Sequence, residues 1–227
     1  MTRGMPVWAL VVLVSLLSPC YAGDVAVEVV ITKRLTKRAL TPPVYNLRGA
    51  VPQAIPEAES IDEFDKTIVM LEGGKTPPLA PQAVTIEQRG GRFEPGLVVV
   101  PVGSSVSFPN FDPIFHNVFS LSRAQSFDLG FYPKDHTKTV KFNRAGIVQV
   151  YCHIHSNMYA AIVVTSSPWF GKPSANGIAA FPDVPAGRYK VVAWHKVAGV
   201  HQTEVEVLAA GPTRVKIRVP IDTEPGM

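Results

Sequence analysis

The sequence contains little cysteine. Only Cys20 and Cys152 occur among its 227 residues, and Cys20 lies in an apolar N-terminal segment. If that segment is removed on export, Cys152 is left alone and no internal disulfide can form. A lone cysteine in an exported chain indicates an intermolecular disulfide, a reactive thiol or a metal ligand.

Long apolar runs are also missing. The N-terminal run from Val7 to Leu17 is too short to span a bilayer. Arg3 precedes it, and the small and turn-forming residues that follow end at Ala22. This pattern predicts a signal peptide over residues 1–22, cleaved after Ala22. We therefore expect a periplasmic protein without stable membrane insertion after cleavage.

The chain has no strong excess of charge. Loss of Arg3 with the signal peptide takes the basic residues from 22 to 21, against 18 acidic ones, and leaves a net charge of +3. A balance this mild does not predict a nucleic-acid partner.

Proline is abundant and falls between short runs rich in β-branched residues. This punctuation favours an all-β fold. Seven strands are expected within about 80 residues, which is the density of a β-sandwich. Their predicted ranges are 84–88, 97–100, 106–108, 117–119, 140–142, 148–151 and 160–164.

Further strands are expected on both sides of this region. Two precede it, and four follow it, at 25–31, 67–71, 177–181, 188–194, 203–208 and 213–219, with a short helix near 61–64. Neither set is large enough to bury a core of its own. We therefore predict that 24–75 and 170–221 form one Ig-like β-sandwich, with the domain 84–166 inserted between them. The simpler alternative is a series of separate modules.

A candidate metal site lies near the end of the central region. His155 follows Cys152 by three residues and Met158 follows by three more, so that one loop between two strands can direct all three side chains at one ion. The alternatives are a buried apolar cysteine, an exposed loop histidine and a methionine that fills a gap in the core.

His116 completes the predicted set if its strand lies beside this loop. A thiolate, two imidazoles and a weakly bound thioether are the ligands of a blue-copper electron-transfer site. The amide of Asn117 can form a hydrogen bond across to the loop that carries Cys152 and His155, which fixes the ligand geometry. The alternative is that Asn117 closes a turn.

His153 is a competing ligand. A histidine beside the cysteine also occurs in multicopper oxidases, where it binds a coupled oxygen-reducing cluster. The remaining histidines, His136, His195 and His201, are isolated in the sequence. A multinuclear site is therefore not expected.

The central region resembles the plastocyanin and amicyanin branch of the cupredoxins. The residues that carry the resemblance are Phe93-x-Pro95, the apolar strand ending at Gly103, Phe108-x-Asn110, His116-Asn117-Val118 and Tyr151-Cys152-x-x-His155-x-x-Met158. The resemblance covers residues 84–166, and the two-residue spacer before Met158 is similar to that of amicyanin. It implies a Greek-key sandwich with His116, Cys152, His155 and Met158 as ligands of one type 1 copper ion.

The flanking regions resemble the carboxypeptidase regulatory-like fold through residues 176–189, Asn-Gly-Ile-Ala-Ala-Phe-Pro-Asp-Val-Pro-Ala-Gly-Arg-Tyr. Bacterial proteins with this combination are often called methylamine-utilisation-like or plastocyanin-like, a label that does not show any involvement of methylamine.

The resemblance implies a soluble carrier of single electrons between redox partner proteins. In cupredoxins the last ligand histidine reaches the surface through an apolar patch, for which Pro113, Ile114 and Tyr159 are candidates here. Tyr151, beside the cysteine, is either a second electron route or a core aromatic. The alternatives are a copper storage or delivery protein and an adhesion module with structural copper. An enzyme is not expected, because four protein ligands leave no open position on the metal.

Overall fold

The computed structural model describes residues 22–32, 62–74, 76–209 and 211–221. Most of the predicted signal peptide and residues 33–61 lie outside these ranges. The described chain is all-β, with a single short 3-10 helix at Phe64–Lys66, which confirms the predicted fold class. In this part of the chain, no helix has the length and apolar character needed to cross a membrane.

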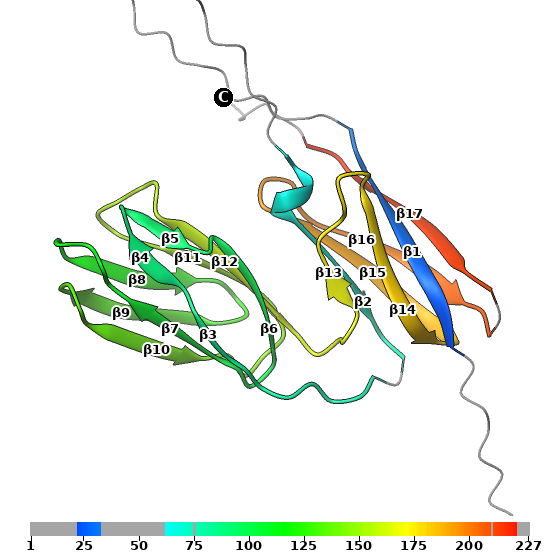
Figure 1. The fold of residues 1–227 in the computed structure, drawn as a ribbon, viewed down its shortest axis with the longest axis horizontal. Helices are drawn as coiled ribbons and strands as arrows, with labels where there is room; N and C mark the ends of the chain where they lie inside the picture. Colours follow the sequence, from blue (N-terminus) through cyan, green and yellow to red (C-terminus); the bar gives the residue numbers. More distant parts are fainter. Residues whose placement is uncertain (1–21, 33–61, 75, 210, 222–227) are drawn as a thin grey trace, which may run out of the picture.

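Seven strands form what we call the flanking sandwich (Figure 1). One sheet has the order β14-β1-β17 and the other the order β13-β2-β15-β16. In chain order the strands are β1 (Ala22–Ile31), β2 (Thr67–Glu72), β13 (Phe170–Gly171), β14 (Ile178–Pro185), β15 (Gly187–His195), β16 (Gly199–Val207) and β17 (Thr213–Val219).

Strand β1, at the start of the described chain, lies beside β17, at its end. It pairs antiparallel with β14 and parallel with β17, and β2 pairs antiparallel with β15. Residues before 75 and after 170 therefore share both sheets of the flanking sandwich, and their apolar side chains share one core.

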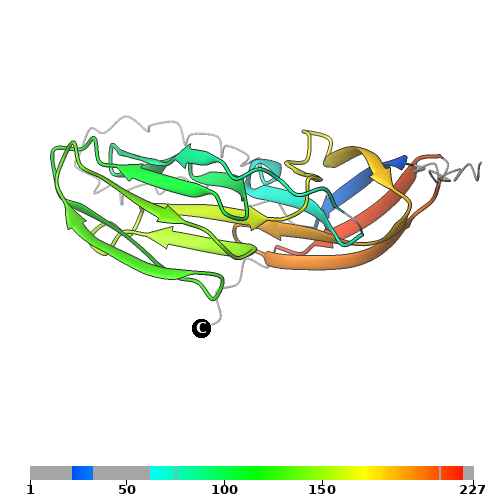
Figure 2. The same cartoon turned by 90° about the horizontal axis from the view of Figure 1, so that it is seen from below.

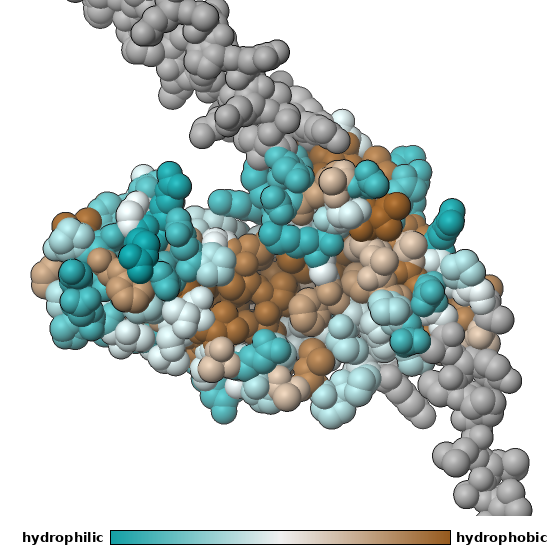
Figure 3. All heavy atoms as spheres, viewed as in Figure 1, coloured by the Kyte–Doolittle hydropathy of each residue, from teal (hydrophilic) through white to brown (hydrophobic). Residues whose placement is uncertain are grey.

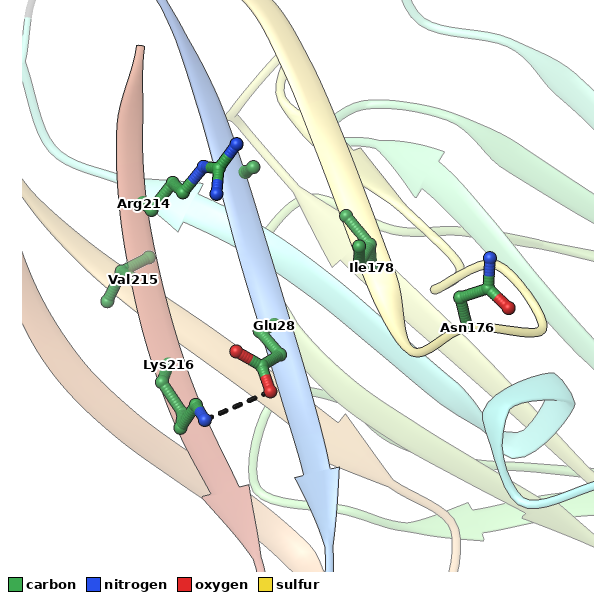
Figure 4. A pocket seen from close by; sticks show the side chains of 7 residues that line it. Glu28, Asn176, Ile178, Arg214, Val215 and Lys216 are labelled. Carbon is green, nitrogen blue, oxygen red and sulfur yellow. Dashed lines mark ion pairs between the residues drawn. The ribbon is translucent and has the colours of Figure 1, made fainter.

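The alternation of side chains along β1 shows how this sandwich buries one face. Val25, Val27 and Val29 point into the core, while Glu28 lies on the outer face and forms an ion pair with Lys216 of β17 at 3.0 Å (Figure 4). Successive residues of a strand point to opposite faces, so this polar face and the apolar core arise from the same strand.

Ten strands form what we call the central sandwich. One sheet has the order β6-β12-β11-β8-β9, the other the order β10-β7-β3, and β4 and β5 form a hairpin. The strands are β3 (Ala83–Thr85), β4 (Glu87–Arg89), β5 (Arg92–Glu94), β6 (Leu97–Pro101), β7 (Ser105–Pro109), β8 (His116–Leu121), β9 (Ser126–Tyr132), β10 (Thr137–Lys141), β11 (Gly146–Tyr151) and β12 (Tyr159–Thr165).

The two sandwiches lie one after the other along the long axis of the molecule (Figure 1, Figure 2). A third apolar cluster lies between them, and Figure 3 shows apolar surface across the middle of the molecule. The buried residues of this cluster between the sandwiches come from β2, β12 and β15. They are Ile68, Met70, Ala161, Val163, Val192 and Trp194.

Strands β2 and β12 are buried on both faces along almost their whole length, and β15 is buried on both faces from Val191 to His195. In β12, Ala161 and Val163 face the cluster between the sandwiches, while Ala160 and Ile162 belong to the core of the central sandwich. Strands buried on both faces have continuous apolar sequences in place of alternating ones. This explains the uninterrupted apolar runs at 68–71, 160–164 and 191–194.

The predicted strands differ from the structure in a few places. The strand expected at 84–88 is interrupted at the buried residue Ile86, because β3 pairs with β7 while β4 pairs with β5. Strands β5, β9 and β13 were not expected. The helix expected near 61–64 is the 3-10 turn at Phe64–Lys66, although residue 61 lies outside the described ranges.

A buried pair of ionisable side chains anchors the start of β2. His195 Nε2 lies 3.1 Å from Glu63 Oε2, and both side chains are almost fully inaccessible. The other ring nitrogen, Nδ1, accepts hydrogen bonds from the backbone N–H groups of Val197 and Ala198. The neutral ring therefore donates from Nε2 to Glu63, and a second proton on Nδ1 has no acceptor.

This arrangement makes stability depend on pH. Burial lowers the pKa of His195 below its usual value, although Glu63 opposes the shift. Between the unfolded pKa of about 6.5 and the lower folded value, the unfolded chain binds a proton that the folded chain does not. Stability is therefore lost as the pH falls through this range.

We expect the metal-free protein to lose free energy of unfolding more steeply between pH 7 and pH 5 than its His195→Gln variant. The difference in slope is at most about 1.4 kcal/mol per pH unit, the limit for one proton. Urea unfolding at several pH values measures both slopes. The variant is less stable throughout, so the slope is the informative quantity, and equal slopes would contradict the assignment.

Candidate metal centre

The topology brings the four predicted ligands to one end of the five-stranded sheet. His116 is the first residue of β8, Cys152 directly follows β11, and Met158 directly precedes β12. Strand β11 lies between β8 and β12 and is antiparallel to both. The start of β8, the end of β11 and the start of β12 therefore lie side by side, with His155 in the loop that connects β11 to β12.

Three metal-binding side chains converge at this end of the sheet. The Nδ1 atoms of His116 and His155 are 3.0 Å apart, and Cys152 Sγ is 3.8 Å from His155 Nδ1. All three donor atoms lie within 4.8 Å of one another. In the described part of the chain, this is the one group of three or more histidine, cysteine or acidic side chains arranged so closely.

The spacing of the donor atoms fits a single metal ion. Nitrogen and sulfur ligands at about 2.0 and 2.3 Å from an ion, in a roughly trigonal arrangement, lie about 3 to 4 Å from each other. His116 is fully buried and Cys152 is 5% exposed, whereas His155 is partly accessible. Two imidazoles and a thiolate form a soft donor set that suits copper or zinc and does not suit calcium or magnesium.

Met158 is fully buried, in the same core cluster as Cys152. Its backbone N–H donates a hydrogen bond to the carbonyl oxygen of His155 at 3.0 Å, which closes the ligand loop into a turn. Burial in the core is compatible both with a thioether ligand and with the gap-filling role common for methionine.

Asp112 is a functional residue that the sequence did not indicate. Its Oδ2 atom lies 2.8 Å from His116 Nε2, and its carboxylate also accepts hydrogen bonds from the backbone N–H groups of Gly90 and Gly91 at 2.6 and 2.9 Å. The contact engages Nε2, which leaves Nδ1 directed toward Cys152 and His155. In the sequence, Asp112 precedes a proline and cannot be distinguished from a turn residue.

The surroundings keep Asp112 ionised. Burial raises the pKa of its carboxyl group, but the hydrogen bonds from Gly91, His116 and Gly90 outweigh this effect, and the pKa is lowered overall. A carboxylate that accepts a hydrogen bond from a metal-binding histidine orients the ring and increases its basicity.

Asn117 connects the strand of His116 to the ligand loop. Its Oδ1 atom accepts a hydrogen bond from the backbone N–H of His153 at 2.9 Å, and its Nδ2 atom donates to Asp128 Oδ1 at 2.8 Å. Of the two roles considered for Asn117, the hydrogen bond across to the other loop is confirmed.

His153 does not join the cluster. Its ring stacks on Phe119, with centroids 3.8 Å apart, and its Nε2 atom lies 3.4 Å from Asp128 Oδ2 on the exposed side of the sheet. His195 is held by Glu63, and His136 and His201 contact backbone carbonyl groups. None of these four rings lies in the group formed by His116, Cys152 and His155.

Exposed apolar side chains flank the ligands in the sequence. Ile114 and Phe115, just before His116, are 48% and 56% exposed, and Ile154, next to His155, is 53% exposed. Tyr159 was expected in the same patch, but it packs against the cluster between the two sandwiches. That expectation is wrong for Tyr159 because β12 has both faces buried.

Comparisons with known proteins add a likeness to part of the chain. No family model matches it, and no curated protein matches it. Among solved structures, the chain is similar to a copper(I) form of an amicyanin variant, at 21% identity and a TM-score of 0.35, over 37% of this chain and 82% of that one.

Two other solved structures are similar at the same level. A copper-containing nitrite reductase from Thermus scotoductus SA-01 has 24% identity and a TM-score of 0.35, over 41% of this chain and 24% of its own. A purple cupredoxin from Nitrosopumilus maritimus has 21% identity and a TM-score of 0.34, over 36% of this chain and 99% of its own. The assignment of ligands rests on the residues of this chain.

The role of Asp112 predicts the effect of removing its charge. We expect Asp112→Asn to weaken the binding of added Cu²⁺ by about 10- to 100-fold, the range found for the partners of metal-binding histidines. Competition with a chelator measures the affinity. Asp183→Asn, which removes an exposed carboxylate from the flanking sandwich, is the matched control and should bind as the parent does. Equal affinity in both variants would show that Asp112 does not act on the site.

Proposed function

We propose that the protein binds one type 1 copper ion, which His116, Cys152 and His155 would hold with Met158 as a fourth, weaker ligand, and that it carries single electrons. The observation that carries this proposal is the convergence of two imidazole nitrogens and one thiol sulfur within 4.8 Å, next to a buried methionine. Zinc commonly takes nitrogen and sulfur ligands as well, but two histidines, one cysteine and a distant thioether are the set typical of blue copper.

The bound ion would supply a one-electron couple, Cu(II)/Cu(I). The protein's own contribution is to hold the ligands in place whether the ion is oxidised or reduced. Asp112 orients the ring of His116, and Asn117 ties β8 to the backbone of the ligand loop. Burial of His116, Cys152 and Met158 keeps water away from most of the site.

The position of His155 at the surface supports a route for electrons to and from the metal site through its ring. This histidine is the accessible member of the three, and Ile154 beside it is exposed. Together with Ile114 and Phe115, it offers an apolar surface on which a redox partner protein can dock. A weak, mainly apolar contact of this kind suits a carrier that has to dissociate after each transfer.

Several features support a carrier over an enzyme. Four protein side chains would fill the coordination positions, whereas catalytic metal sites keep one open for water or substrate. The predicted signal peptide over residues 1–22 supports a periplasmic location, and the mild net charge supports protein partners over nucleic acid.

The visible and EPR spectra of the copper-loaded protein test the ligand assignment. We expect an intense blue cysteine-to-copper band that disappears in Cys152→Ser and persists in His153→Gln. The histidine variant is the matched control, because His153 lies beside Cys152 but faces away from the cluster. A band that survives in Cys152→Ser would overturn the assignment.

The same sample separates a carrier from a copper storage or delivery protein. A carrier should lose its colour with a one-electron reductant and recover it fully with an oxidant over repeated cycles. Copper that leaves the protein on reduction would favour storage or delivery.

A further inference from the structure

A pocket of about 310 Å³ lies where the two sandwiches meet. Both sandwiches contribute to its walls. The central sandwich supplies Pro95, Gly96, Leu97 and Tyr159, and the flanking part of the chain supplies Asp65, Lys66, Lys172, Trp194 and Lys196. Pockets for small ligands begin at about this size and occur preferentially between domains.

The charged residues of this pocket are mostly cationic. Lys172 forms an ion pair with Asp65 at 3.3 Å. Lys66 Nζ lies 3.4 Å from Glu63 Oε2, and the same carboxylate oxygen also contacts Nε2 of His195. Both of these lysines have acidic partners.

Lys196 differs from the other two lysines. Among the described residues it forms no ion pair, and its Nζ atom lies 4.3 Å from the ring centroid of Tyr159 in the other sandwich. Lys196 is an exposed residue, but the partial burial of its side chain lowers its pKa, and the nearby charge of Lys66 lowers it further. A negative charge in the pocket would favour the protonated form of Lys196 and offset both effects.

The rest of the lining is apolar. Trp194 is 3% exposed, and Leu97 and Tyr159 are partly buried against the same cluster between the sandwiches. Such apolar walls make no favourable contact with an inorganic anion. They suit a ligand whose negatively charged group contacts the lysines and whose apolar body packs against the aromatic rings of the lining.

We propose that this junction pocket binds a small organic carboxylate with an apolar body. Lys196 is its principal cation and Lys66 and Lys172 lie nearby, while Tyr159 and Leu97 contact the apolar body. The flanking part of the chain would then have a role of its own, because it provides every cationic residue of the pocket.

The pocket adjoins the ligand loop. Tyr159 follows Met158 directly, and its ring packs edge-on against Tyr151 with centroids 5.3 Å apart. Tyr151 in turn precedes Cys152. A ligand in the pocket therefore contacts a residue that neighbours the metal centre through the chain and through a ring contact.

The experiment uses the metal-free protein, so that its outcome does not depend on copper binding. Benzoate is titrated and followed by NMR, with benzamide as the uncharged analogue and acetate as the anion without a ring. We expect saturable shifts of the Trp194 indole N–H and the Gly96 amide with benzoate, and at least tenfold weaker binding of benzamide and acetate.

Two lysine variants locate the site. Lys196→Met should weaken benzoate binding at least about tenfold, on the scale of one charge-assisted hydrogen bond. Lys190→Met removes an exposed charge from β15, the strand that ends just before Lys196, outside the lining of this pocket, and should bind as the parent does. If the first variant folds poorly, Lys172→Met provides a second test at another exposed position of the lining, with weaker binding expected.

Three results would overturn the proposal. They are no saturable shift at the two reporter groups, equal binding of benzoate and benzamide, or equal loss of affinity in the Lys196 and Lys190 variants. Because no metal is present, any of these results would leave the proposed copper site untouched, and a failed copper site would leave the pocket untouched.

Discussion

The burial of β12 on both faces is the constraint on which the rest of the structure depends. Ala160 and Ile162 fill the core of the central sandwich, and Ala161 and Val163 fill the cluster between the sandwiches. Shifting a strand by one residue exchanges its two faces. Because both faces of β12 are packed, its register is strongly specified, and so is the position of Met158 at its start. Strand β11, paired with β12 along its whole length, places Cys152 in the same way.

The candidate metal centre adds local hydrogen bonds to this framework. Burial of the strands positions the ligand backbone, but it does not determine how an imidazole ring is rotated. The hydrogen bond to Asp112 sets the rotation of the His116 ring, and Asn117 fixes the ligand loop against β8. Copper(I) and copper(II) prefer different geometries, and a site held by such contacts resists rearrangement between them. The packing and the hydrogen bonds thus act on different degrees of freedom of one site.

The sequence predicted the parts that depend on local spacing. Cys152, His155 and Met158 lie on one short loop, and a short loop limits how far apart they can be. Asp112 and Tyr159 were missed or misplaced because their roles depend on residues distant in the sequence: Asp112 meets Gly90 and Gly91, and Tyr159 meets Lys196. The apolar runs in β2, β12 and β15 indicated buried strands. They did not indicate that the second face of each would meet another sandwich, because an apolar run carries no information about its partner.

X-ray absorption at the copper edge, on the oxidised and the reduced protein, tests the central claim most directly. That claim is that a preformed set of two histidines and one cysteine holds copper in both oxidation states. The expected result is one short copper–sulfur distance and two copper–nitrogen distances in both spectra, with little change between them. Loss of the sulfur signal, or a change on reduction to a different number of ligands, would contradict the claim.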